Sequence, residues 1–118
     1  MNTLDVPIIQ QTYDLFRSLH ALTPTIPKLA RHTLWQRCQN ISLDILQGFI
    51  ATGYTAPDKR AERLARISES VDLLRVLIRL CCDTKVINQK SYIALQQALD
   101  DIGRMLGGWL KSIRRPST

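Results

Sequence analysis

The sequence has 118 residues, of which 45% are hydrophobic and 6% aromatic, and its net charge is +6. A chain of this length can bury one modest core, and it contains no apolar run long enough to span a bilayer, so we expect no membrane-spanning helix. Twelve of the sixteen Lys and Arg residues lie after residue 56. This excess favours a polyanionic partner, most often nucleic acid, although a basic surface that serves only solubility fits the composition equally well.

Four stretches of the sequence have the apolar spacing of amphipathic helices. Apolar residues recur every three or four positions in each, and no run of alternating β-branched residues predicts a strand. The connections are short, so successive helices should be antiparallel. The sequence therefore predicts a single all-α domain over residues 1–118, an antiparallel up-down-up-down four-helix bundle with helices at about 7–22, 27–52, 57–83 and 88–113.

Polar residues mark the expected helix boundaries. Proline fits the first turn of a helix, and a preceding Asp or Thr can cap the free amides. Asn88 is expected to cap the fourth helix, and Gly53 suits the left-handed position that ends the second. Three helices begin with a polar residue two positions before proline: Asp5 and Pro7, Thr25 and Pro27, and Thr55 and Pro57.

The last predicted helix keeps a strict apolar seam although it contains three glycines. Each glycine costs about 1 kcal/mol relative to alanine inside a helix. Gly103, Gly107 and Gly108 therefore indicate that another backbone or another subunit comes close there, and Trp109 is expected in the core. The seam consists of Tyr92, Leu95, Leu99, Ile102, Leu106, Trp109 and Ile113.

The third predicted helix has a second apolar stripe beside its main seam, formed by Leu73, Leu77 and Leu80. A face this wide suits a further apolar neighbour. Together with the glycines, it predicts a homo-oligomer. Trp35, near the start of the second helix, fits a core or interface position better than a base-stacking one.

A group of cations begins the third helix and another ends the fourth. Antiparallel packing brings both groups to one pole of the bundle, where those at the helix N-terminus oppose its dipole. We expect a phosphate-binding surface there; the alternative is a solvated face partly neutralised by Asp58 and Glu62. The cations are Lys59, Arg60, Arg63, Arg66, Lys111, Arg114 and Arg115.

A smaller basic group is expected at the opposite pole, where Lys28 and Arg31 lie beside His32. These cations are further candidates for contact with nucleic acid. Arg75, one turn from Arg79 on the third helix, is expected to pair with Asp72 instead of joining them.

No residue pattern indicates catalysis. His20 and His32 match no metal-binding spacing, and the adjacent carboxylates of Asp100 and Asp101 point to different faces of a helix. No phosphate-binding glycine loop or nucleophile motif is present. We therefore expect a protein that is not an enzyme and that holds no cofactor or metal.

The cysteines and the N-terminus indicate a cytoplasmic protein. Cys38, Cys81 and Cys82 are an odd number without a CxxC pair, and they fall at or beside apolar positions. We expect buried, reduced thiols. Asp5 and Pro7 interrupt the basic-then-apolar pattern of a signal peptide.

The run Gly103-Arg104-Met105-Leu106-Gly107-Gly108-Trp109-Leu110 resembles the C-terminal signature of the Avd family, the accessory variability determinants of diversity-generating retroelements. The resemblance covers about residues 10–113. More distantly, the chain is similar to the four-helix-bundle proteins encoded by intervening sequences in bacterial ribosomal RNA genes. Three further segments contribute to the resemblance to Avd: Ile26–Lys28, Phe49–Gly53 and Leu73–Arg79.

The resemblance to Avd implies a four-helix bundle that assembles as a homopentamer. It also implies two partners, the reverse transcriptase of the retroelement and its template RNA or cDNA, and a role in mutagenic reverse transcription. Two alternatives remain at this point: an oligomeric four-helix interaction scaffold that binds no nucleic acid, and a bundle protein of the ribosomal intervening-sequence type.

Overall fold

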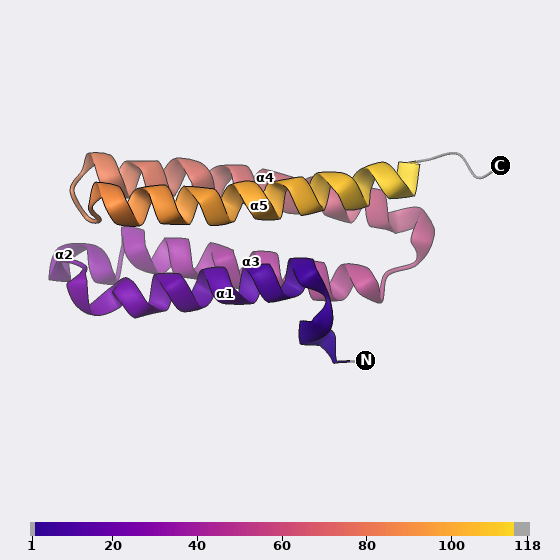
Figure 1. Cartoon of the computed structure of the whole chain (residues 1–118), viewed down its shortest axis with the longest axis horizontal. Helices are drawn as coiled ribbons and strands as arrows, with labels where there is room; N and C mark the ends of the chain where they lie inside the picture. The colour runs from indigo at the N-terminus through magenta and orange to yellow at the C-terminus, as the bar shows by residue number, and fades with distance from the viewer. Residues whose placement is uncertain (1, 115–118) are drawn as a thin grey trace.

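Four long antiparallel helices form the fold (Figure 1). The computed structural model describes residues 2–114. Each long helix packs on two others: α1 and α4 each contact both α3 and α5. The predicted all-α four-helix bundle is confirmed, and residues 2–114 contain no strand. The helices are α1 (Pro7–Leu22), α2 (Lys28–Arg31), α3 (Leu34–Gly53), α4 (Pro57–Asp83) and α5 (Gln89–Arg114), with short 3-10 turns at Thr3–Asp5 and Thr23–Thr25.

The core consists of the apolar seams that the sequence predicts. All four long helices contribute residues at three- and four-residue spacing, and burying each large apolar side chain stabilises the fold by about 1.5–3 kcal/mol. The bundle measures 53 × 26 × 21 Å, so its two ends are well-separated surfaces. Fully buried members include Leu15, Leu19, Trp35, Cys38, Ile45, Phe49, Leu64, Leu74, Ile78, Leu99 and Ile102.

The prediction of one continuous helix over 27–52 is wrong, because α2 ends at Arg31 and α3 begins at Leu34. The α3 seam begins at the buried Trp35. Extending that seam backwards by four and seven residues would place Arg31 and Lys28 on the core face of the helix. Burial of unpaired cations is costly. The break at residues 32–33 lets α2 depart from the line of α3, so that Lys28 is exposed and does not face the core.

Two of the expected N-terminal caps serve the preceding helices instead. The hydroxyl of Thr25 donates to the carbonyl of Leu22 at 2.7 Å, and that of Thr55 donates to the carbonyl of Ala51 at 2.7 Å. Both bonds satisfy carbonyls at a helix C-terminus, which lack partners within the helix. Asp5 is also not a cap, because α1 has Val6 at that position and no side-chain cap bond.

The cap expected at Asn88 is confirmed, since its side-chain oxygen accepts the amide N–H of Ser91 at 2.8 Å. The left-handed residue expected at Gly53 is not found, because no glycine of residues 2–114 has a positive φ. That conformation occurs at Lys85, with φ of 64°, where α4 turns into α5. The amides of Lys85 and Val86 bond back to the carbonyls of Cys82 and Cys81, which closes the helix as a Schellman motif.

A close helix contact occurs at a glycine to which the sequence analysis gives no role. A Cβ on Gly48 of α3 would lie 2.9 Å from the side chain of Ile67 on α4. Glycine therefore allows Ile67 to reach the core against the α3 backbone.

Candidate nucleic-acid interface

The cations at the start of α4 and at the end of α5 lie at the same end of the bundle, as predicted (Figure 1). Arg115, also assigned to this surface from the sequence, lies outside the described residues. We call the described set the basic end. It consists of Lys59, Arg60, Arg63, Arg66, Lys111 and Arg114.

The cations of the basic end differ in whether they form hydrogen bonds or ion pairs within the chain. The Nε of Arg60 donates to the carbonyl of Thr55 at 2.9 Å, and Arg66 lies 4.0 Å from the carboxylate of Glu62. The pair of Arg66 and Glu62 is largely exposed, so it contributes little stability. Among the described residues, no carboxylate lies within 4.0 Å of the other four cations. Three of these, Lys59, Lys111 and Arg114, are exposed.

The smaller basic group lies at the opposite end, on α2 (Figure 1). Lys28 and His32 are exposed, whereas Arg31 is half-buried. The guanidinium of Arg31 donates through Nε to the carbonyl of Ile26 at 2.8 Å and through Nη2 to that of Pro24 at 3.2 Å. Arg31 and Arg60 thus use the same device: each donates to a carbonyl five residues earlier, ahead of its helix.

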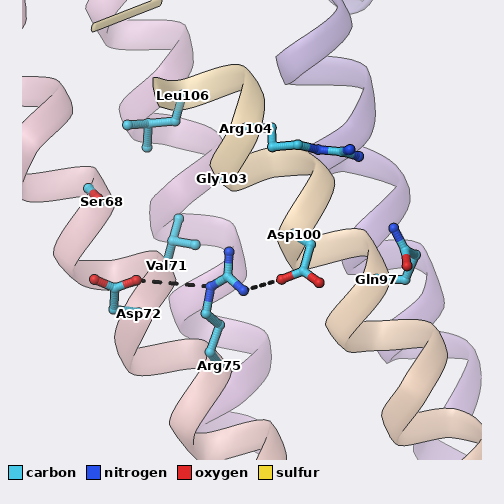
Figure 2. A pocket seen from close by; sticks show the side chains of 9 residues that line it. All are labelled: Ser68, Val71, Asp72, Arg75, Gln97, Asp100, Gly103, Arg104 and Leu106. Atoms are coloured by element: carbon cyan, nitrogen blue, oxygen red, sulfur yellow. Dashed lines mark hydrogen bonds and ion pairs between the residues drawn. The ribbon is translucent and has the colours of Figure 1, made fainter. Parts of the chain in front are cut away.

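Arg75 connects α4 to α5 (Figure 2). Its guanidinium pairs with the carboxylate of Asp100 and donates to the carbonyl of Leu99 at 3.2 Å. The side-chain amide of Gln96 donates in return to the Arg75 carbonyl at 2.9 Å. The expected partner, Asp72, lies 4.0 Å from Nε, so the Asp72 contact is present but secondary.

Gly103 provides space for this ion pair. A Cβ at Gly103 would lie 2.7 Å from Nη2 of Arg75, closer than real Cβ contacts occur. The sequence predicts another backbone or another subunit close to Gly103, but the neighbour found in the described chain is the guanidinium of Arg75. Gly107 and Gly108 are exposed, and no atom of residues 2–114 lies within 4 Å of a Cβ built on either. The close approach predicted at these two glycines is therefore not made by the described part of the chain.

The two tryptophans occupy different environments. Trp35 is fully buried, and its indole N–H donates to the hydroxyl of Thr23 at 3.3 Å, so it is a core residue. Trp109 is half-buried at the edge of the core, with its ring tilted against that of Phe49 at a centroid distance of 6.4 Å. The expectation of a core position for Trp109 is met only in part.

The cysteines are free thiols. Cys38 and Cys81 are fully buried, with their sulfur atoms 3.9 Å apart, and Cys82 is half-buried. The hydrogen bond to Cys81, together with burial, raises the pKa of the Cys38 thiol. No group of three or more His, Cys, Asp or Glu residues within the described chain is arranged to hold a metal ion.

Two interactions at these surfaces were not predicted from the sequence: the ion pair between α4 and α5, and the arginine bonds to backbone carbonyls. The bond between Arg75 and Asp100 depends on the register of α4 against α5, which helical periodicity does not specify. The backbone bonds of Arg31 and Arg60 had a visible signal, because each arginine follows a proline by three or four residues at a helix start.

The family comparison concerns nearly the whole described chain. The model of the bAvd-like family matches residues 6–113, which agrees with the resemblance seen at the glycine and tryptophan run. No curated protein matches the chain. None of the helices in residues 2–114 is both long enough and apolar enough to cross a membrane.

Proposed function

Because the chain belongs to the bAvd-like family, we propose that it is the non-catalytic accessory protein of a diversity-generating retroelement. In this role it binds the reverse transcriptase of the element and its template RNA or cDNA, and so supports mutagenic reverse transcription. Avd-like proteins are accessory proteins and not catalysts, and membership implies association with components of a retroelement.

The observation that carries the nucleic-acid part of the proposal is the basic end. Lys59, Lys111 and Arg114 are exposed, and among the described residues none has a carboxylate within 4.0 Å. Lys and Arg side chains in such a position neutralise phosphates and release condensed counterions. Phosphate contacts hold the strand in place without reading its sequence. Binding at the basic end should therefore be salt-dependent and nearly independent of base sequence.

We also propose that the protein acts as a homo-oligomer, a pentamer by analogy with its family. The outer face of α4 supports self-association, because Leu73, Val76 and Leu80 are 42%, 65% and 43% exposed. Ile93 on α5 is 58% exposed as well. Oligomerisation would cover apolar area of this kind and would repeat the basic end around the assembly.

The test is the dependence of RNA affinity on salt in a triple variant, Lys59→Gln, Lys111→Gln and Arg114→Gln. Arg60 and Arg66 are less informative, because one bonds a backbone carbonyl and the other lies beside Glu62. Losing three phosphate contacts should reduce the slope of log affinity against log salt by about 2 on single-stranded RNA.

A matched control removes the same charge elsewhere, through Arg17→Gln, Arg79→Gln and Arg104→Gln. Each of these arginines already has a carboxylate partner, so the slope should change much less. If the folded basic-end variant keeps the wild-type slope, the basic end is only a solvated surface. An oligomeric interaction scaffold without nucleic-acid binding would then be the better account.

A further inference from the structure

A pocket lined by both polar and apolar side chains lies between α1 and α3, beside α2 and away from the basic end. It has a volume of about 290 Å³, which is enough to admit a single nucleobase. The residues that matter here are Phe16 on α1, Gln36 and Asn40 on α3, and Arg31 and His32 where α2 ends. The proposed function uses none of them.

The charge of this pocket distinguishes it from the larger pocket between α4 and α5. Among the residues that the structure describes, no Asp or Glu lines the α1–α3 pocket. The α4–α5 pocket is lined by Asp72 and Asp100, and the guanidinium of Arg75 is already engaged there (Figure 2). Of these two pockets, the α1–α3 pocket is therefore the one that offers an uncompensated positive charge to a ligand.

The guanidinium of Arg31 is oriented by hydrogen bonds that leave part of it free to bind an anion. Its Nε and Nη2 are bonded to the carbonyls of Ile26 and Pro24, which fixes the guanidinium plane. No carboxylate lies within 4.0 Å of it among the described residues, and no protein acceptor engages Nη1. A guanidinium oriented in this way binds a phosphate oxygen with little further loss of side-chain entropy.

The pocket also has the chemistry of base recognition. The ring of Phe16 lines the pocket, is half-buried, and stacks on His20 with a centroid distance of 5.8 Å. Gln36 and Asn40 are exposed one turn apart on the same face of α3, and no residue of the described chain hydrogen-bonds their amides. An amide offers both a donor and an acceptor, as base edges require. Unstacked bases are recognised in single strands by this pairing of an aromatic ring with amides.

We infer that this pocket binds one unstacked nucleobase of a single-stranded nucleic acid, with its phosphate on Arg31. The inference rests on the proposed function, because it assigns a second contact to the same strand. It adds what the basic end lacks, a contact that depends on the base itself and not only on the phosphates.

The experiment compares a short single-stranded RNA with an oligonucleotide of equal length and charge that carries abasic sites. Wild-type protein should bind the complete RNA about tenfold more tightly, the difference expected for one stacked base. The variant Phe16→Leu, and separately the double variant Gln36→Ala with Asn40→Ala, should remove most of this preference. Both should keep the wild-type affinity for the abasic oligonucleotide, because the basic end is unchanged.

Matched controls come from the same helices. Tyr13→Leu removes an exposed aromatic ring of α1, and Gln47→Ala removes an exposed amide two turns beyond Asn40 on α3. Neither residue lines the pocket, so neither change should alter the preference. If Phe16→Leu fails to fold, the double variant still decides the question, since Gln36 and Asn40 are exposed.

The outcomes separate this inference from the proposed function. Equal wild-type binding of complete and abasic strands would overturn the inference and leave the proposed function in place. Binding of neither strand would overturn both. Binding of a free mononucleotide as tightly as the RNA would also overturn the inference, because the ligand would then be a soluble nucleotide and not a strand.

Discussion

Substituting alanine at Gly103 tests whether this glycine makes room for the ion pair between α4 and α5. A Cβ there would lie 2.7 Å from Nη2 of Arg75, so the guanidinium must move. Its pairing with Asp100 and its bond to the Leu99 carbonyl would weaken together.

Two opposing effects set the size of the change. Replacing glycine by alanine inside a helix stabilises it by about 1 kcal/mol. The side chains of Arg75 and Asp100 are 31% and 54% exposed, so solvent screening limits the loss from their contact to about 1 kcal/mol. We therefore expect Gly103→Ala to leave the free energy of unfolding nearly unchanged. Gly108→Ala, where a Cβ meets nothing within 4 Å, should raise it by about 1 kcal/mol.

The assay is urea unfolding followed by circular dichroism, in a double-mutant cycle with Arg75→Ala. Without the guanidinium, Gly103→Ala should become stabilising by about 1 kcal/mol, which gives a coupling energy of the same size. If Gly103→Ala stabilises the wild-type protein as much as Gly108→Ala does, the guanidinium does not require the glycine, and the reasoning is refuted.

Three further predictions concern other parts of the bundle. Lys85→Gly should raise the free energy of unfolding by about 1 kcal/mol, because φ of 64° strains any residue with a Cβ; a lower urea midpoint would contradict this. A thiol reagent should label only Cys82 in the native protein and all three cysteines after unfolding, since Cys38 and Cys81 are fully buried. Rapid native labelling of Cys38 would show that the core opens there. If the chain self-associates as proposed, Gly107→Leu should preserve the helical spectrum, because its Cβ position is open in the described chain, yet lower the mass measured by light scattering; an unchanged mass would exclude Gly107 from the proposed subunit contact.

The apolar seams were predictable because burial selects residues at helical spacing, and the buried core contains the predicted seam residues Leu95, Leu99, Ile102 and Leu106. The break after Arg31 was not predicted, although a signal was present. Counting back from Trp35 places two cations on the core face, which a continuous helix could not accommodate.

Side-chain partners were less predictable than helices. A threonine before a proline can cap the following helix or bond the preceding one, and at Thr25 and Thr55 the second option is found. The preference of Arg75 for Asp100 over Asp72 depends on how α5 lies against α4. Assignment of the basic residues to nucleic-acid contact remains a prediction, because charge alone does not identify the partner.

The most direct test of the accessory role is co-purification with the reverse transcriptase of the same retroelement. The two proteins would be co-expressed with the template RNA, and this chain would be recovered through an affinity tag at moderate salt. The account predicts that the polymerase and the RNA are retained together, and that the purified chain alone has no polymerase or nuclease activity. Recovery of this chain without the polymerase, from cells that contain both proteins in folded form, would contradict it.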